Sequence, residues 1–330
     1  MIRTIGVIGA GRIAERHVAA YKKIGVERII LADSNHAVAE ERSRAWQIEL
    51  APSPQSLIDD PRVEAINICV PTMFHASYAI AALEAEKHVF CEKPLCTSMD
   101  DALRIKAAAM RAGKRAMVGY LYRFYPAFVF VKQILEQQII GEPYMALIRV
   151  GGRGGTSAWK HQSGQGGGAV SEMMVHMLDL AKWFFGPIDD LTPLWHTTLL
   201  PERSVGSAQV SATAEDFCVV KMRAGNVQIL CESDLATPSY MQHIDIQGAN
   251  GSVFSSILHY LPTVVYCKEQ RGIYDQGNNN YSFPQVNVFE KELAYFLEAA
   301  DGAPHTINGL DDSIHIVGLM ERIADAAAVR

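Results

Sequence analysis

Short apolar runs alternate with helical patterns through the first third of the chain. The runs are predicted as strands at Ile5–Ile8, Arg28–Ala32, Glu64–Val70, His88–Cys91 and Ala116–Val118. Between them, helices are predicted at Ile13–Ile24, Phe74–Glu86 and Ser98–Ala112. Apolar strands separated by helices are typical of a parallel sheet that is buried on both faces. This part of the chain is therefore predicted to be an α/β domain with a doubly wound parallel sheet.

The alternation stops after Gly119, and a different pattern follows. A long helix is predicted at Tyr125–Gln138, and later runs suit antiparallel strands at Met145–Val150, Phe217–Met222, Val227–Glu232, His243–Gln247 and Thr263–Cys267. Helices are predicted at Val288–Ala300 and Asp311–Ala327, a mobile loop at Gly151–Gly155 and a polar loop at Gln276–Asn280. We expect two domains, residues 1–120 and 121–330, the second of them α+β with a large, mostly antiparallel open sheet.

The composition is that of an ordinary soluble protein, with 49% hydrophobic and 20% charged residues among 330. The net charge of −6 argues against nucleic acids and anionic membranes as partners, because both bind clustered basic side chains. No apolar stretch is long enough to span a membrane, and the first strand follows Met1 too closely to leave room for a signal peptide. The six cysteines are scattered, so we expect reduced thiols in a cytoplasmic protein.

A glycine-rich turn follows the first predicted strand at once. Residues 9–14 match the pattern G-x-G-x-x-A. In this pattern Gly9 permits a tight turn, Gly11 lets the backbone approach a pyrophosphate, and Ala14 lets the next helix lie close to the strand. The pyrophosphate would meet the N-terminus of that helix, where unpaired N–H groups and the helix dipole favour negative charge.

An acid also stands where a dinucleotide site requires one. Asp33 ends the second predicted strand, 22 residues after Gly11, close to the spacing of about 20 at which an acid binds the adenosine ribose hydroxyls. Its charge would repel a 2′-phosphate, which favours NAD over NADP as the cofactor. The alternative is a glycine turn beside an unrelated surface acid. The predicted cofactor-binding set also includes Arg12, Ile13, Pro71, Thr72, His75, Glu92 and Lys93.

Lys93 lies between Glu92 and Pro94, directly after the fourth predicted strand. The carboxyl ends of parallel strands form the ligand crevice of such sheets, and Pro94 keeps residue 93 extended. The Lys93 ammonium could therefore stabilise an alkoxide as a hydride leaves the same carbon, or act as a base if burial lowers its pKa. The alternative is a surface lysine paired with Glu92.

A helical stretch at Ala169–Phe185 follows three glycines and places Glu172, His176 and Asp179 on one face. His176 is the candidate proton acceptor, oriented by one of the two acids. A satisfied histidine in a partly buried helix is the competing interpretation. A divalent-metal site made of the same three side chains is a third, but no second cluster of ligands supports it, and we expect no metal.

Together these motifs resemble the Gfo/Idh/MocA oxidoreductases over nearly the whole chain. The resemblance rests on the Gly9 turn, on residues 88–94, on Gly119 with Arg123 and Pro126, and on residues 166–179. It implies an NAD(P)-binding Rossmann domain and an α+β domain that lines a sugar or polyol pocket. It also implies that Lys93 and His176 are catalytic. Glu172 replaces the aspartate that is usual in the family, and Met174 stands where glycine is common.

The same resemblance implies a substrate pocket in the second domain. Its predicted substrate-binding residues are Arg123, Trp159, Lys160, Glu172 and Asp179, together with the neighbouring His161. Trp159 could stack on a sugar face, and Lys160 or Arg153 could bind a carboxylate or phosphate. A solvent-facing position is the alternative for each.

The predicted function is a cytoplasmic NAD-dependent dehydrogenase that acts on a secondary hydroxyl or ketone of a sugar, polyol or sugar derivative. In this prediction His176 takes the proton and Lys93 stabilises the oxyanion. A redox-neutral enzyme with tightly held NAD would use the same residues, and a non-catalytic dinucleotide-binding regulator is the other alternative. The exposed face of the second sheet is a candidate surface for a homodimer or homotetramer.

Overall fold

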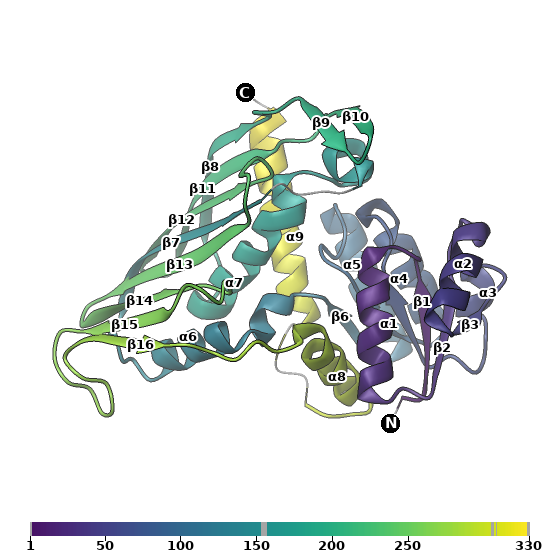
Figure 1. Ribbon diagram of the computed structural model, residues 1–330, viewed down its shortest axis with the longest axis horizontal. Coiled ribbons are helices and arrows are strands. Elements are labelled where there is room, and N and C mark those ends of the chain that lie inside the picture. Colours follow the sequence, from purple (N-terminus) through teal and green to yellow (C-terminus); the bar gives the residue numbers. More distant parts are fainter. Residues whose placement is uncertain (1, 153–156, 305–306, 308, 329–330) are drawn as a thin grey trace. The chain divides into compact units, whose positions relative to one another are not determined.

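The first part of the chain folds as the six-stranded parallel sheet that its apolar runs predict (Figure 1). The computed structural model describes residues 2–152, 157–304, 307 and 309–328. The strand order is β3-β2-β1-β4-β5-β6, with every pair parallel. The strands are β1 (Thr4–Ile8), β2 (Arg28–Ala32), β3 (Glu49–Leu50), β4 (Ala65–Ile68), β5 (His88–Cys91) and β6 (Ala116–Val118).

The helices that connect these strands confirm the predicted alternation. They are α1 (Arg12–Ile24), α2 (His36–Trp46), α3 (Pro54–Ile58), the 3₁₀ turn η1 (Thr72–Phe74), α4 (His75–Glu84) and α5 (Met99–Ala112). Gly25 ends α1 in the left-handed conformation, and Ser98 caps α5 by accepting the Asp101 N–H. The prediction missed β3, α2 and α3, because their short or mixed patterns carry no clear apolar period.

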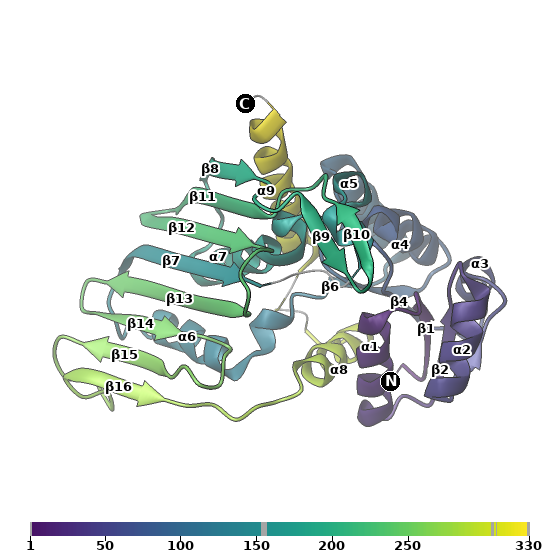
Figure 2. The ribbon, with the colours of Figure 1, turned by 45° about the horizontal axis from the view of Figure 1, so that its top comes forward.

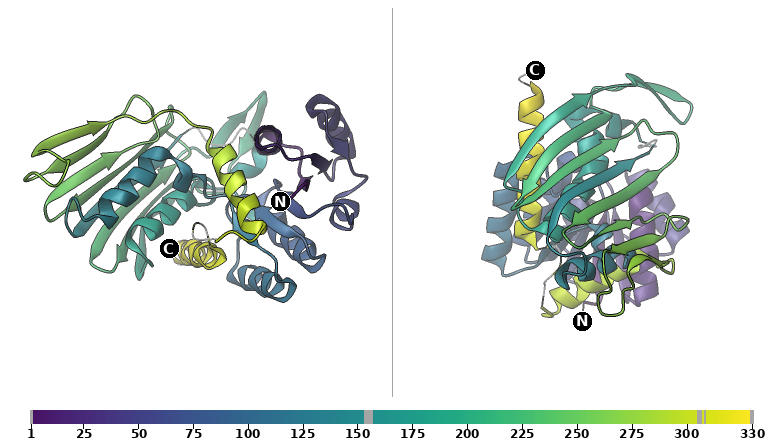
Figure 3. Two further views of the ribbon diagram at one scale, coloured as in Figure 1. Left: turned by 90° about the horizontal axis from the view of Figure 1, so that it is seen from below. Right: turned by 90° about the vertical axis from the view of Figure 1, so that its left-hand side faces the viewer.

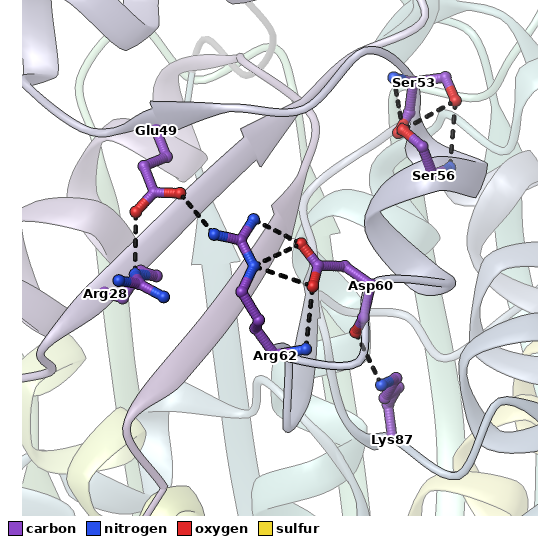
Figure 4. A network of polar contacts seen from close by, with 7 residues as sticks. All are labelled: Arg28, Glu49, Ser53, Ser56, Asp60, Arg62 and Lys87. Carbon is purple, nitrogen blue, oxygen red and sulfur yellow. Dashed lines mark hydrogen bonds and ion pairs between the residues drawn. The ribbon is translucent and has the colours of Figure 1, made fainter.

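The two-residue strand β3 pairs with β2, and a network of charged side chains lies beside this pairing (Figure 4). Its Glu49 carboxylate lies 2.9 Å from Arg28 Nε and 3.3 Å from Arg62 Nη1. The Arg62 guanidinium also binds Asp60, and this hydrogen bond lowers the pKa of that carboxyl. Lys87 donates to the Asp60 carbonyl from the other side. The network therefore connects β2, β3 and the loop before β4.

Compact packing divides the chain into two units that differ from the predicted domains. Unit 1 comprises residues 1–121 and 287–317, and unit 2 comprises residues 122–286 and 318–330. The predicted helices near the C-terminus are α8 (Val288–Ala300) and α9 (Leu310–Ala328). Helix α8 packs against α1 within unit 1 (Figure 1), and α9 begins in unit 1 and ends in unit 2. The division into 1–120 and 121–330 thus stays a prediction, whereas α8 packs with the N-terminal part of the chain.

Unit 2 is built on an eight-stranded sheet of order β16-β15-β14-β13-β7-β12-β11-β8. Its strands are β7 (Pro143–Gly151), β8 (Asp190–Thr197), β11 (Phe217–Ala224), β12 (Val227–Asp234), β13 (Met241–Gly248), β14 (Gly251–Ser255), β15 (Thr263–Cys267) and β16 (Gly277–Tyr281). All pairs are antiparallel except β7 with β12, so the mostly antiparallel sheet is confirmed. A separate hairpin of β9 (Glu202–Val205) and β10 (Ala208–Ser211) stands outside this sheet (Figure 2).

The polar loop predicted at Gln276–Asn280 is wrong, because residues 277–281 form the edge strand β16. Asparagine is unfavourable in strands, so the composition gave no signal. The Asn279 amide donates to the Val265 carbonyl, and the Tyr281 ring packs 4.7 Å from the Phe130 ring. The backbone pairing with β15, side-chain bonds of Asn279 and aromatic contacts of Tyr281 therefore hold an edge strand that the pattern does not reveal.

One face of the unit-2 sheet is covered by two helices, α6 (Pro126–Glu136) and α7 (Val175–Phe185) (Figure 1). The strands alternate as a half-covered sheet should, with buried residues such as Ile148, Ile229 and Ile244 beneath the helices. The right-hand view of Figure 3 looks onto the opposite face, where the strands lie in front of both helices. Within the described ranges, no helix is long and apolar enough to cross a membrane.

Candidate active site

The glycine turn has the geometry that a dinucleotide site requires. Gly9 has φ +106°, and a Cβ added there would lie 2.4 Å from the Cys69 carbonyl oxygen, so only glycine fits. A Cβ on Gly11 would meet no atom within 4 Å, which leaves the approach to the turn open. Gly11 is the N-cap of α1 and offers no side chain to the first N–H groups of that helix. The backbone N–H groups at the start of α1 can therefore donate hydrogen bonds to a phosphate oxygen.

Asp33 lies beside this turn, as the spacing predicts. One carboxylate oxygen accepts the Ala10 N–H at 2.8 Å, and the other accepts the Asn35 N–H at 2.8 Å. These backbone donors fix the acid at the end of β2, where ribose hydroxyls can donate to it. Tyr78 of α4, which the sequence did not single out, lies near the same acid. Burial and the Asp33 charge both raise the pKa of Tyr78.

The buried hydroxyl of Thr72 shows whether unit 1 has a polar group that a ligand could satisfy. It begins η1 at the loop after β4, and its side chain is 2% exposed. Its hydroxyl has no hydrogen-bond partner among the described residues. A buried hydroxyl without a partner costs about 1–3 kcal/mol, which a polar group of a bound ligand would offset. The turn, Asp33 and Thr72 therefore fit a dinucleotide bound along this edge of the sheet.

Glu92, whose predicted contact with the cofactor stays a prediction, forms a buried ion pair with His17 of α1. The Glu92 Oε1 atom lies 3.0 Å from His17 Nε2, and the His17 side chain is fully buried. Burial disfavours both charges; Cys69 and Glu92 nevertheless raise the pKa of His17 to about 10, and His17 holds the pKa of Glu92 below its usual value. The sequence placed His17 on the buried face of its helix without identifying this partner.

The predicted contact of His75 with the cofactor also stays a prediction, and its ring faces two backbone carbonyl groups. Its Nδ1 atom lies 2.7 Å from the Pro94 carbonyl oxygen, and its Nε2 atom lies 2.9 Å from the Val70 carbonyl oxygen. The residue is 1% exposed. Both ring nitrogens are therefore occupied by backbone, and His75 connects the segments that follow β4 and β5.

Lys93 lies directly after β5, at the carboxyl edge where the sequence placed it. It is partly exposed, and its backbone N–H donates to Glu92 Oε2 at 3.2 Å. The Lys93–Pro94 peptide bond is cis. The Glu92 carboxylate thus contacts His17 and the Lys93 backbone, and the catalytic role of Lys93 and the alternative of a surface lysine paired with Glu92 both stay open.

In unit 2, the predicted helix at Ala169–Phe185 begins with a π-helical segment, Val170–Met174, which continues into α7. Such segments occur often at functional sites. Glu215 receives the Val170 N–H at 2.9 Å, and a Cβ on Gly168 would lie 2.5 Å from the Glu215 carboxylate. Gly168 thus lets the acid reach the start of the helix. Burial raises the pKa of Glu215 to about 7.

His176 is buried on this helix and stacks on Tyr122, with ring centroids 4.6 Å apart and an interplanar angle of 20°. The Tyr122 hydroxyl in turn forms a hydrogen bond with the Tyr240 hydroxyl. Neither tyrosine was predicted, because each is distant from His176 in sequence. A stacked ring can fix the plane of the imidazole, which the sequence had assigned to Glu172 or Asp179.

The predicted substrate-binding acids are each bound to a predicted substrate-binding cation. Asp179 receives bonds of 2.6 to 3.1 Å from the Arg123 guanidinium, and both side chains are at most 2% exposed. Glu172 forms an ion pair with Lys160. The buried Arg123–Asp179 pair favours positioning roles for these two residues. The predicted contacts of all four side chains with a substrate stay predictions.

The remaining predicted pocket residues lie on a short turn, η3 (Ala158–His161), which precedes another, η4 (Ser163–Gln165). The Lys160 ammonium lies 5.4 Å from the centre of the half-buried Trp159 ring, and His161 is buried. Arg153 and most of the predicted mobile loop lie outside the described residues. Where the structure is described, no group of three His, Cys, Asp or Glu side chains is arranged to hold a metal ion.

Comparison with known families matches both parts of the chain. Residues 3–120 match the model described as "Oxidoreductase family, NAD-binding Rossmann fold", and residues 128–254 match the "GFO/IDH/MocA C-terminal domain". The myo-inositol 2-dehydrogenase of Thermotoga maritima is 28% identical over 95% of this chain and 93% of its own. The inositol 2-dehydrogenase of Acidothermus cellulolyticus is 33% identical over 55% of this chain and 53% of its own.

A solved structure shares the fold across the whole chain. A levoglucosan dehydrogenase in complex with NADH and levoglucosan aligns with a TM-score of 0.87 and 21% identity, and the match covers 99% of this chain and 97% of that one. The structural match shows the fold, and the family match over residues 3–120 covers the segment that holds the glycine turn and Asp33.

Proposed function

The chain belongs to the Gfo/Idh/MocA family of NAD-binding oxidoreductases, and from this premise we propose that it transfers a hydride between NAD and a secondary hydroxyl or ketone of a sugar, an inositol-like polyol or a sugar derivative. The observation that supports this most directly is the Asp33 carboxylate bound to the Ala10 N–H within the glycine turn. This contact supports the proposal, because an acid that binds ribose and a backbone turn that binds pyrophosphate are neighbours in dinucleotide sites.

NAD, when bound, supplies the nicotinamide that accepts or returns the hydride. Gly11 and the start of α1 bind its pyrophosphate, Asp33 its ribose, and Thr72 donates its unpaired hydroxyl to a cofactor oxygen. At the substrate, Lys93 stabilises the oxygen that becomes negative as hydride leaves the carbon. His176 accepts the hydroxyl proton, in a ring plane that Tyr122 sets.

Glu172 contributes to substrate binding through its ion pair with Lys160. Glu172 lies in the π-helical segment Val170–Met174 that leads into α7, where a carboxylate can accept a hydrogen bond from a polyol hydroxyl. The contact with Lys160 is made by one of the two carboxylate oxygens of Glu172. We place the protein in the cytoplasm, because its six cysteines are free and buried; its recovery from a secreted fraction would contradict this.

The first test is the appearance of NADH absorbance when the protein is mixed with NAD and a panel of inositols, sugars and nucleotide sugars. We expect at least one neutral polyol or sugar to reduce NAD. The Lys93→Ala variant should bind NADH as well as the unchanged protein does and lose at least about 100-fold in kcat, because a donor to the oxyanion is worth that much.

Two results would contradict the proposal. Equal turnover in the Lys93→Ala variant would remove Lys93 from the mechanism. Cofactor that co-purifies in full occupancy, with product formed and no net NADH, would instead indicate the redox-neutral reaction. An exposed lysine of α1, Lys23, provides the matched control, and its alanine variant should retain activity.

A further inference from the structure

The segment that carries Lys93 is held by a buried histidine that no sequence motif assigned to this task. His75 Nδ1 contacts the carbonyl oxygen of Pro94, the residue after the lysine, at 2.7 Å. His75 Nε2 contacts the carbonyl oxygen of Val70, in the segment that leads to Thr72, at 2.9 Å. A single imidazole thus bridges the exits of two neighbouring parallel strands, β4 and β5.

The chemistry of these contacts sets the direction of each bond. A carbonyl oxygen only accepts, so a ring nitrogen of His75 bonds its carbonyl only while it carries a proton, and burial lowers the pKa of His75, which favours the neutral ring. A neutral ring has one N–H and donates to one carbonyl at a time, whereas an imidazolium donates to both. The contact with Pro94 is the shorter one, and it is the bond that a neutral ring with its proton on Nδ1 keeps.

A second buried histidine holds the same segment from the other side. His17 Nε2 lies 3.0 Å from one oxygen of Glu92, and the other oxygen of Glu92 accepts the Lys93 N–H at 3.2 Å. The His17 ring is itself fixed between Phe90 and Phe289, at centroid distances of 5.6 and 5.5 Å. A buried ion pair contributes little net stability, so the role of the His17–Glu92 pair is to fix the position of the Lys93 backbone.

We propose that His17 and His75 are positioning residues that fix the backbone on both sides of Lys93, so that its ammonium meets the reacting oxygen. This rests on the proposed role of Lys93 in hydride transfer. His17 lies on the helix that begins at the glycine turn, and His75 joins the Thr72 segment. The two histidines therefore fix the position of Lys93 relative to the glycine turn and the Thr72 segment, the two segments that bind the cofactor in this proposal.

Crossed substitutions test the proposal. The amide nitrogen of asparagine takes the place of histidine Nδ1, and that of glutamine takes the place of Nε2. His75→Asn therefore retains the donor to Pro94, and His75→Gln loses it. At the other position the order reverses. His17→Gln keeps an N–H in the place of Nε2, which lies 3.0 Å from Glu92, and gives up the Nδ1 contacts with Asn67 and Cys69, whereas His17→Asn keeps a group in the place of Nδ1 and loses the contact with Glu92. Ser77→Ala, an exposed change on the same helix as His75, is the control.

Two measurements are made on each full-length variant. The first is kcat and KM for NAD and for the best polyol of the panel. We expect His75→Gln and His17→Asn to lose about 10-fold to 100-fold in kcat with little change in either KM, because a misplacement of about 1 Å has this effect. His75→Asn, His17→Gln and the control should stay within about threefold of the unchanged protein.

The second measurement is hydrogen–deuterium exchange of the peptide that spans residues 89–98, which requires no substrate. Exchange should be faster in His75→Gln and His17→Asn and unchanged in the other variants. Loss of kcat in all four variants, or in none, would overturn the proposal, as would exchange that does not follow the crossed pattern. If the pattern appears in exchange while the unchanged protein oxidises no polyol, the positioning stands and the proposed function fails.

Discussion

At the scale of single residues, Glu215 is the group whose charge should govern how folding depends on pH. Its carboxyl is 11% exposed and accepts the Val170 N–H, and burial raises its pKa to about 7. Its pKa in the unfolded chain is about 4.3. Between these values the folded protein binds more protons than the unfolded chain, so this contribution to stability is full below pH 4 and is lost as the pH rises through 7.

Replacing Glu215 by Gln should remove this dependence while retaining an acceptor for Val170. From pH 5 to pH 8 the unchanged protein should lose up to about 3 kcal/mol more of its free energy of unfolding than the variant. Urea denaturation at both pH values measures the difference. Glu202→Gln, an exposed acid on β9, is the control and should behave as the unchanged protein does. Parallel pH profiles for all three proteins would refute the assignment.

The same scale shows which site residues can be predicted from sequence. Asp33 and the glycine turn were found because a short strand–helix–strand unit fixes their separation along the chain. Glu215 reaches Val170 across 45 residues, and Tyr122 reaches Tyr240 across 118. Such contacts depend on how strands order within a sheet, which local spacing does not determine.

At the scale of elements, the Arg123–Asp179 pair fastens α7 to the 3₁₀ turn η2 (Leu121–Phe124). Asp179→Asn leaves the guanidinium buried without its full counter-charge, and we expect a loss of about 3–5 kcal/mol in the unfolding free energy. The double change Arg123→Met with Asp179→Leu should recover most of it, because no charge is then buried. Chemical denaturation measures both.

A matched control for this pair lies on the surface of α6. Lys132 and Glu136 form an ion pair of 3.5 Å with Glu136 61% exposed, and Glu136→Gln should change stability by less than about 1 kcal/mol. An Asp179→Asn variant no less stable than this control would mean that the buried pair holds nothing in place.

The type of an element could be predicted where burial leaves a clear apolar pattern in the sequence. The strands β1, β2 and β5 lie in the core of a parallel sheet, so nearly every position is apolar. The strands β9 and β10 are exposed along most of their length, and residues 170–180 are buried on nearly all sides. A pattern with no polar face cannot distinguish a π-helical start from an α-helix.

At the scale of the whole molecule, the sequence did not reveal that residues 287–317 pack with the N-terminal unit. Helix α8 packs against α1, and its Phe289 ring lies beside His17. The apolar face of a helix indicates that this face is buried, but it does not indicate which sheet or helix covers it. Prediction from sequence order therefore assigned α8 to the part of the chain that precedes it.

The homodimer or homotetramer expected from the sequence stays a prediction, and its candidate surface is the uncovered face of the unit-2 sheet (Figure 3). This face carries the partly exposed side chains of Met145, Leu147, Leu230 and Tyr266. Leu147 and Leu230 are register partners on β7 and β12, so they form one apolar spot at the middle of the sheet. Large exposed apolar residues that gather on a sheet face mark a protein-binding surface.

The double change Leu147→Glu with Leu230→Glu should convert an oligomer into a monomer, because four like charges would meet across a two-fold interface. Light scattering after gel filtration measures the mass of both proteins. The control is Ile273→Glu, an 86% exposed residue on the loop between β15 and β16, which should leave the mass unchanged. An unchanged protein that is monomeric at all concentrations, or a charged variant that keeps its partners, would show that this sheet face binds no second copy.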